Sequence, residues 1–290
     1  MICTLCPRNC GAERTAEHGS GFCGMPAGLR VARAMLHQWE EPPISGTNGA
    51  GTVFFSGCTL RCCYCQNGSI SVGGQGKDIS TARLREIFDE LIARGAHNIE
   101  LVTPTHFLPW ILPALEPKLP VPVVYNCGGY EKVDTLRQLE GLVDIYLPDL
   151  KYADGALAKA LSGAEDYFPA ACGAIREMFR QVGRPVYDEN GLMKQGVILR
   201  HLVLPGYLNN TRKVLDWIAE TFAPGDVVVS LMSQYTPPAG MTGRLARRVT
   251  AAEYRAAVTY VRNCGIEDGF VQERTSAEEA YTPAFDGTGV

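Results

Sequence analysis

Three cysteines in one short loop carry the clearest chemistry in this sequence. Cys58, Cys62 and Cys65 have the spacing C-x3-C-x2-C within the run CTLRCCYCQN. Thiolates are soft ligands that suit iron–sulfur clusters, zinc and Cu(I). Because an iron–sulfur cube ordinarily takes four cysteine ligands, a loop with three leaves one iron open to a substrate or cofactor. Cys63 breaks no spacing rule, and we interpret it as a packed neighbour rather than a ligand.

A structural zinc loop is the alternative for these three cysteines. Zinc sites usually pair ligands from two separate hairpins. No second cysteine pair follows downstream at such a spacing, because Cys127, Cys172 and Cys264 stand alone. The spacing therefore favours an iron–sulfur cluster.

The same loop resembles that of the radical SAM superfamily. The match rests on the cysteine spacing, on Tyr64 just before the third cysteine, and on Gln66-Asn67 just after it. The resemblance implies a [4Fe–4S] cluster whose open iron chelates the amino and carboxylate groups of S-adenosylmethionine, with Tyr64 near the cofactor. It also implies reductive cleavage of that cofactor to a 5′-deoxyadenosyl radical, which abstracts a hydrogen atom from a substrate.

A second group of cysteines lies near the start of the chain. Cys3, Cys6, Cys10 and Cys23 have the spacing C-x2-C-x3-C-x12-C. Four thiolates at such spacings fit either a closed zinc site or a second [4Fe–4S] cluster. The segment has little apolar content, so a bound metal would supply much of its stability. We favour the cluster, since auxiliary clusters occur in many radical SAM enzymes, and zinc stays open.

Composition narrows the class of protein. The chain has 290 residues, 46% of them hydrophobic, and a net charge of −4 with both signs interspersed. This balance gives no electrostatic footprint for nucleic acid or an anionic membrane. There is no long apolar segment, and MICTLCPRNC lacks the apolar core of a signal peptide. We expect a cytoplasmic protein, in which eleven cysteines indicate metal or catalysis rather than disulfides.

Strand and helix patterns alternate after residue 51. The expected strands are 52–56, 98–102, 121–125, 143–147, 197–204 and 226–232. The expected helices are 80–91, 107–115, 133–139, 154–161, 170–182, 210–222 and 250–264. Ser80 and Asn210 are candidate N-caps, Thr250 with Glu253 forms a capping box, and residues 185–195 predict a small hairpin.

Such alternation implies a parallel sheet with right-handed crossovers. Six units are consistent with an open barrel, and the resemblance implies the same, since radical SAM cores are partial (β/α)6 barrels. The expected fold class is therefore α/β, a partial (β/α)6 barrel with a small N-terminal metal-binding segment. We expect a cysteine-rich segment at 1–45, the barrel at 46–272, and a tail at 273–290 that is either mobile or folds over the barrel mouth.

Polar residues stand where successive strands end, and parallel α/β folds place ligands there. They are Thr103, Thr105 and His106 after the second strand, Asn126 after the third, Asp149 and Lys151 after the fourth, Arg200 and His201 in the fifth, and Ser233-Gln234-Tyr235 after the sixth. Each alone is more often a surface ion pair or a satisfied structural group. Their coincidence at successive strand ends indicates a site.

The segments NCGGY, PDLK and RHLVLPG resemble those at the same strands in the pyruvate formate-lyase activating enzyme group, as a branch set apart by the N-terminal four-cysteine segment. By that resemblance Asn126 borders the active site and Arg200 meets the cofactor carboxylate. Lys151, Asp149 and His201 are the candidate catalytic residues.

That group usually carries Gly-Gly-Glu after the second strand, where it binds the amino group of S-adenosylmethionine. Here the chain has Thr103-Pro104-Thr105-His106. Backbone carbonyls near Thr103 and the side chains of Thr105 and His106 are the expected substitutes.

The leading hypothesis is a radical SAM enzyme that acts on a glycine Cα–H of a partner, activating a glycyl radical enzyme. The alternative is radical SAM modification of a small molecule or peptide. A third hypothesis, from a different functional class, is an iron–sulfur electron carrier or redox sensor. The polar strand ends argue against a carrier, which needs no cofactor site. The expected partners are an electron donor such as flavodoxin or ferredoxin and, under the leading hypothesis, a glycyl radical enzyme.

Overall fold

The computed structural model describes residues 2–271 and 283–290. Within them the main sheet has ten strands in the order β12-β11-β10-β8-β7-β6-β4-β3-β5, with β9 paired to β10. These strands are β3 (Leu29–His37), β4 (Ala50–Phe55), β5 (Lys77–Ile79), β6 (Ile99–Val102), β7 (Val123–Cys127), β8 (Ile145–Pro148), β9 (Val186–Tyr187), β10 (Met193–Leu202), β11 (Val228–Met232) and β12 (Gly269–Val271). A separate two-stranded sheet pairs β1 (Ile2–Cys3) with β2 (Ala12–Glu13).

The six strands expected from the sequence all belong to the parallel part of this sheet. β4, β6, β7, β8, β10 and β11 are neighbours and pair in parallel. Parallel strands are covered on both faces, and all six residues of β4 are buried. The hairpin of β9 with β10 is also present.

The sheet extends beyond the expected strands on both sides. At one edge β12 pairs in parallel with β11. At the other, β3 pairs antiparallel with β4, and β5 antiparallel with β3. Residues 29–37 therefore belong to the main sheet, although the sequence placed them in the cysteine-rich segment. In the described part of the chain the two edge strands, β5 and β12, do not pair with each other, so the expected partial barrel is confirmed as an open one.

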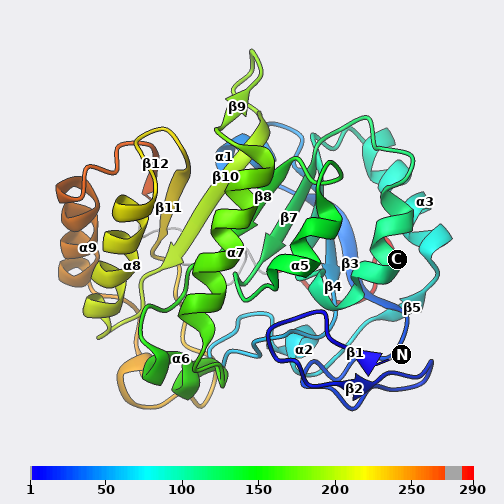
Figure 1. The fold of residues 1–290 in the computed structure, drawn as a ribbon, viewed down its shortest axis with the longest axis horizontal. Helices are drawn as coiled ribbons and strands as arrows, with labels where there is room; N and C mark the ends of the chain where they lie inside the picture. The colour runs from blue at the N-terminus through cyan, green and yellow to red at the C-terminus, as the bar shows by residue number, and fades with distance from the viewer. Residues whose placement is uncertain (1, 272–282) are drawn as a thin grey trace.

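Helices cover one face of the curved sheet, with α3, α5, α7 and α8 in front of it in Figure 1. The α-helices are α1 (Pro42–Ser45), α2 (Gly68–Ser71), α3 (Thr81–Ala93), α4 (Leu108–Ile111), α5 (Val133–Leu136), α6 (Gly155–Ser162), α7 (Tyr167–Val182), α8 (Leu208–Thr221) and α9 (Ala251–Asn263). The helix expected at 107–115 is split into α4 and short 3-10 turns, because Pro109 and Pro113 remove backbone donors. No helix in the described ranges is long and apolar enough to cross a membrane.

Two of the three predicted caps are confirmed. The Ser80 hydroxyl accepts the Arg83 backbone N–H at 3.0 Å, and Thr250 with Glu253 forms the capping box of α9. The Asn210 prediction is wrong, because α8 begins two residues earlier, at Leu208.

Asn210 instead joins α8 to the segment after β8. Its side-chain oxygen accepts the Ala153 backbone N–H at 2.8 Å, and its side-chain nitrogen donates to the Lys151 carbonyl at 2.9 Å. The side chain is buried. It therefore supports the backbone next to Lys151, a predicted site residue.

The described end of the tail packs on β3 and β4. The Phe285 and Phe54 rings are 5.4 Å apart. The Gly287 N–H donates to the Ala32 carbonyl at 3.0 Å, and the Ala34 N–H to the Thr288 carbonyl at 3.1 Å. Residues 273–282, the rest of the tail, lie outside the described residues.

We predict that Asn210→Ala lowers the free energy of unfolding by about 1–3 kcal/mol, because two backbone groups lose their partner. Asn209→Ala is the matched control, since Asn209 is exposed one residue earlier in α8, and should change it by no more than about 0.5 kcal/mol. Urea unfolding of both variants measures the difference. Equal stability of the two would show that the Asn210 side chain does not hold this segment.

Candidate active site

A cavity of about 260 Å³ lies at the C-terminal ends of the parallel strands. Its wall includes the cluster-loop cysteines Cys58, Cys62 and Cys65 and polar residues from the ends of β7, β8 and β10. A larger surface cleft of about 430 Å³ lies at the start of α8 and contains none of the predicted site residues. The smaller cavity is therefore the candidate active site, because predicted site residues line it.

The cluster loop follows β4, and Gly57 turns the chain with φ of +77°. A Cβ at Gly57 would lie 2.4 Å from Met25 Cγ, so only glycine fits against the N-terminal segment here. Cys58, Cys62 and Cys65 are free thiols that line the cavity, whereas Cys63 is exposed and is absent from its wall. This arrangement agrees with Cys63 being a bystander.

The three thiols are a suitable donor set for a cluster with one open iron. Burial, together with the neighbouring Cys62 and Cys65, raises the pKa of Cys58 to about 12. No group of three His, Cys, Asp or Glu side chains among the described residues is placed to hold a single metal ion. A lone zinc holds its sulfurs only roughly 3.8 Å apart, given Zn–S bonds of about 2.3 Å. Three thiols on one cavity wall are the donor set that a cluster with one open iron requires.

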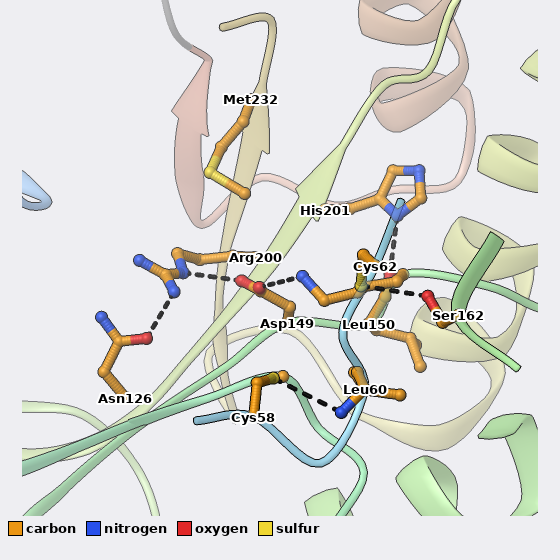
Figure 2. Close-up of polar contacts among 12 residues, drawn as sticks. Cys58, Leu60, Cys62, Asn126, Asp149, Leu150, Ser162, Arg200, His201 and Met232 are labelled. Atoms are coloured by element: carbon orange, nitrogen blue, oxygen red, sulfur yellow. Dashed lines mark hydrogen bonds and ion pairs between the residues drawn. The ribbon is translucent and has the colours of Figure 1, made fainter. Parts of the chain in front are cut away.

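A chain of hydroxyls supports Cys62 from α6. The Ser162 hydroxyl donates to Cys62 Sγ at 3.0 Å, and Figure 2 shows this contact together with the Leu60 N–H on Cys58 Sγ at 3.4 Å. The Tyr152 hydroxyl is 2.7 Å from that of Ser162 and 2.7 Å from that of Tyr64. Bonds of this kind orient ligands and tune the metal they bind. Tyr64 thus holds the loop through its hydroxyl while its side chain lines the cavity.

Arg200 is the centre of a buried polar network on the cavity wall, which Figure 2 shows between Asn126 and Asp149. Its Nε donates to Asp149 Oδ1 at 2.9 Å and its Nη2 to Asn126 Oδ1 at 2.6 Å. Its Nη1 donates to Glu40 Oε2 at 3.1 Å, and Lys151 Nζ donates to Asp149 Oδ2 at 2.5 Å. The structure therefore brings Asn126, Asp149, Lys151 and Arg200 together as the sequence predicted.

The charges in this network support each other. Burial alone would raise the pKa of Asp149, but Arg200 and Lys151 outweigh it and hold that pKa below its ordinary value. Burial alone would lower the pKa of Lys151, but Asp149 and then Cys62 raise it. Asp149, Lys151 and Arg200 are therefore charged at neutral pH, although all three are half-buried in the cavity wall.

His201, Thr105 and His106 do not line the cavity. His201 Nδ1 lies 2.6 Å from the Leu150 carbonyl and Nε2 lies 3.0 Å from Thr211 Oγ1 (Figure 2). Since side chains of a strand alternate in direction, Arg200 on the cavity side places His201 on the other. Burial lowers the pKa of His201 to about 4. The geometry assigns it a structural contact rather than the catalytic contact expected.

Of the residues after β6, some line the cavity and others do not. Thr105 donates to Glu131 Oε1 at 2.8 Å, and His106 Nε2 lies 2.7 Å from the Ser56 carbonyl. Both side chains are buried away from the cavity. Thr103 does line it, with φ of +59°, a conformation that strains a β-branched residue. Of the three expected substitutes for Gly-Gly-Glu, only Thr103 is in position.

The sequence reading missed an acidic group beside the cavity. Glu40 and Glu41 line it, and Glu100 lies fully buried beneath it, bound by Asn126 Nδ2 at 2.6 Å. The signal available was Glu100, a charged residue inside the otherwise apolar strand IELV, since charged side chains are almost never fully buried unless paired.

The N-terminal cysteines lie beside the cluster loop. Cys3 and Cys6 are buried, Cys23 is half-buried and Cys10 is exposed. Burial raises the pKa of Cys6 to about 12, and in the described ranges no three of these thiols are placed to hold a single metal ion. Their segment is anchored where the Arg8 guanidinium donates to the Thr59 carbonyl at 2.9 Å and the Ser162 carbonyl at 2.7 Å. Figure 1 shows the β1–β2 hairpin next to α2.

Comparisons with known proteins agree with this geometry. Residues 44–103 match the protein-family model described as a 4Fe-4S single cluster domain. Over 245 residues, 81% of this chain, the sequence is 30% identical to protein MJ0674 of Methanocaldococcus jannaschii. The chain covers 66% of the length of that relative.

Solved structures show the same fold. SuiB of Streptococcus suis bound to S-adenosylmethionine superposes with a TM-score of 0.52 at 15% identity, over 75% of this chain and 48% of SuiB. Methylornithine synthase (PylB) gives 0.50 at 14% identity, over 80% of this chain and 68% of that one. The chain thus spans about half the length of SuiB.

At these identities the likeness establishes the fold, and the matched domain covers the cysteine loop. The chain therefore has the α/β fold of these solved structures, and its residues 44–103 resemble a 4Fe-4S single cluster domain.

Proposed function

We propose that this protein is a radical SAM enzyme. The observation that carries the proposal is that Cys58, Cys62 and Cys65 share one cavity with the charged network of Arg200. These cysteines would hold a [4Fe–4S] cluster, which supplies the electron that cleaves S-adenosylmethionine to a 5′-deoxyadenosyl radical.

We propose that the remaining residues of the cavity bind and orient the cofactor and exclude water. Arg200 uses three of its five N–H groups on Asp149, Glu40 and Asn126. We propose that the others meet the carboxylate of the cofactor, and that Thr103 offers its backbone carbonyl to the amino group. Part of the cavity wall is apolar, formed by Phe54, Val102, Leu202, Met232 and Tyr235. Such a lining protects a radical from side reactions.

The substrate class follows from the mouth of the cavity. The described end of the tail brings Pro283 to the cavity wall, which favours a small molecule or peptide over a loop of a folded enzyme. Activation of a glycyl radical enzyme stays a prediction from the sequence resemblance. A flavodoxin or ferredoxin is the proposed electron donor in either case.

We further propose that Cys3, Cys6, Cys10 and Cys23 hold a second metal centre, with [4Fe–4S] favoured over zinc. The supporting observation is the direct contact of their segment with the cluster loop through Arg8. A cluster in this place would be well situated for electron transfer, whereas zinc would only stabilise the segment.

We predict that reduced, anaerobically reconstituted protein converts S-adenosylmethionine to 5′-deoxyadenosine, and that Cys62→Ala abolishes this conversion because the cluster loses a ligand. Cys63→Ala is the matched control from the same loop and should retain it. Chromatography of the nucleoside product measures both. Full conversion by Cys62→Ala would refute the radical SAM proposal, and no conversion by the unaltered protein would favour the electron carrier.

Metal analysis tests the N-terminal centre. Two cubes require about eight iron atoms per chain, whereas a cluster with a zinc site requires about four iron atoms and one zinc. Cys6→Ala should lower this content and also the melting temperature, since metal binding and folding are linked. Cys172→Ala, a buried thiol outside both groups, should leave the metal content unchanged. Unchanged metal content in Cys6→Ala would contradict the centre.

A further inference from the structure

One side of the cavity, which we call the acidic wall, consists of Glu40, Glu41 and His37. All three line the cavity. One oxygen of Glu40 is held by Arg200 at 3.1 Å, and one oxygen of Glu41 is held by the Ser230 hydroxyl at 2.7 Å. Both carboxyl groups therefore have fixed positions on the substrate side of the network.

Negative groups outnumber positive ones around this wall. Glu40, Glu41 and Asp149 line the cavity, with Glu100 buried behind them, and among the described residues of the cavity wall the cations are Arg200 and Lys151. Burial raises the pKa of Glu40 well above its ordinary value, and Glu100 and Glu41 raise it further, although Arg200 opposes them. Burial likewise raises the pKa of Glu41. A surplus of buried carboxyl groups is costly unless a cation compensates it.

His37 supplies an independent observation. Only 6% of this residue is exposed, it lines the same cavity, and its buried Nδ1 has no hydrogen-bond partner among the residues that the structure describes. Buried polar atoms are nearly always hydrogen-bonded. Burial lowers the pKa of His37, although Glu100 opposes this shift, and a neutral imidazole can accept a hydrogen bond at one ring nitrogen. An unpartnered nitrogen on an acidic wall indicates a ligand that donates hydrogen bonds.

The approach to the wall is aromatic. Trp39 lines the cavity and is 62% exposed, and Phe54 lines it next to the His37 ring at 5.9 Å. Aromatic faces attract cations through their ring quadrupole. A positively charged group would therefore meet favourable surfaces both at the mouth and at the wall.

We infer that the acidic wall binds a primary ammonium group of the substrate, such as the end of a lysine-like side chain or another alkylamine. An ammonium group offers three N–H donors, and the wall presents the Glu41 carboxyl group and the His37 ring beside Glu40, whose carboxyl group is hydrogen-bonded to both Arg200 and Glu100. The assignment to the substrate rests on the proposed radical SAM function.

Calorimetry with n-butylammonium as the probe tests the inference on reconstituted protein with saturating S-adenosylmethionine and no reductant. n-Butanol and butyrate are the comparison probes, because they have the same chain length without the positive charge. n-Butylammonium should bind saturably, and the two others at least about tenfold more weakly, since charge-assisted hydrogen bonds are the strong ones.

Glu41→Gln should weaken n-butylammonium binding roughly tenfold, through the loss of one charged acceptor. His37→Phe, which keeps an aromatic ring, should also weaken it. Glu86→Gln is the matched control, because Glu86 is an exposed carboxylate on α3, and should bind as the unaltered protein does. The comparison of the three probes on unaltered protein does not depend on how any variant folds.

The outcomes separate the two proposals, because formation of 5′-deoxyadenosine reports radical SAM activity without the probe. Equal binding of the three probes, or preference for butyrate, overturns the ammonium site while that activity stands. Competition between n-butylammonium and S-adenosylmethionine would assign the wall to the amino group of the cofactor and overturn the substrate assignment. Selective binding without any 5′-deoxyadenosine would keep the ammonium site but end its assignment to a radical substrate.

Discussion

The half-buried ion pair of Arg200 with Asp149 is the interaction on which the rest of the site depends. It joins β10 to the end of β8, where the two residues also form a parallel backbone bridge. Through Asn126 and Glu40 the same guanidinium reaches β7 and the segment after β3. A buried charge that loses its partner is strongly destabilising. The ends of strands far apart in the sequence are thereby held at fixed distances around one cavity.

The cluster loop depends on supports from both sides of that cavity. Ser162 at the end of α6 donates to Cys62, and Arg8 of the N-terminal segment binds the carbonyls of Thr59 and Ser162. Asn210 holds the backbone on either side of Tyr152, whose hydroxyl continues the chain to Tyr64. The loop is therefore positioned by side chains that are not themselves ligands, as metal sites generally require.

Local patterns predicted much of this fold, since alternating apolar strands and helices indicate a parallel sheet whichever residues fill it. The capping box of Thr250 is likewise a local signal. Asn210 failed as a cap because its contacts to residues 151 and 153 are tertiary. The orientation of His201 away from the cavity was predictable, because consecutive residues of a strand face opposite sides and Arg200 was already expected to face the site. The acidic wall could not be predicted in this way, because its position depends on β3 pairing antiparallel with β4. No local sequence pattern fixes that pairing.

The central claim is that three cysteines hold a cluster with one iron open to S-adenosylmethionine. Electron paramagnetic resonance tests it directly on anaerobically reconstituted, reduced protein. The account predicts a [4Fe–4S]+ signal that changes when S-adenosylmethionine is added, because the cofactor becomes a ligand of the open iron. A cluster signal that stays the same at saturating S-adenosylmethionine, or no such signal at all, would contradict it.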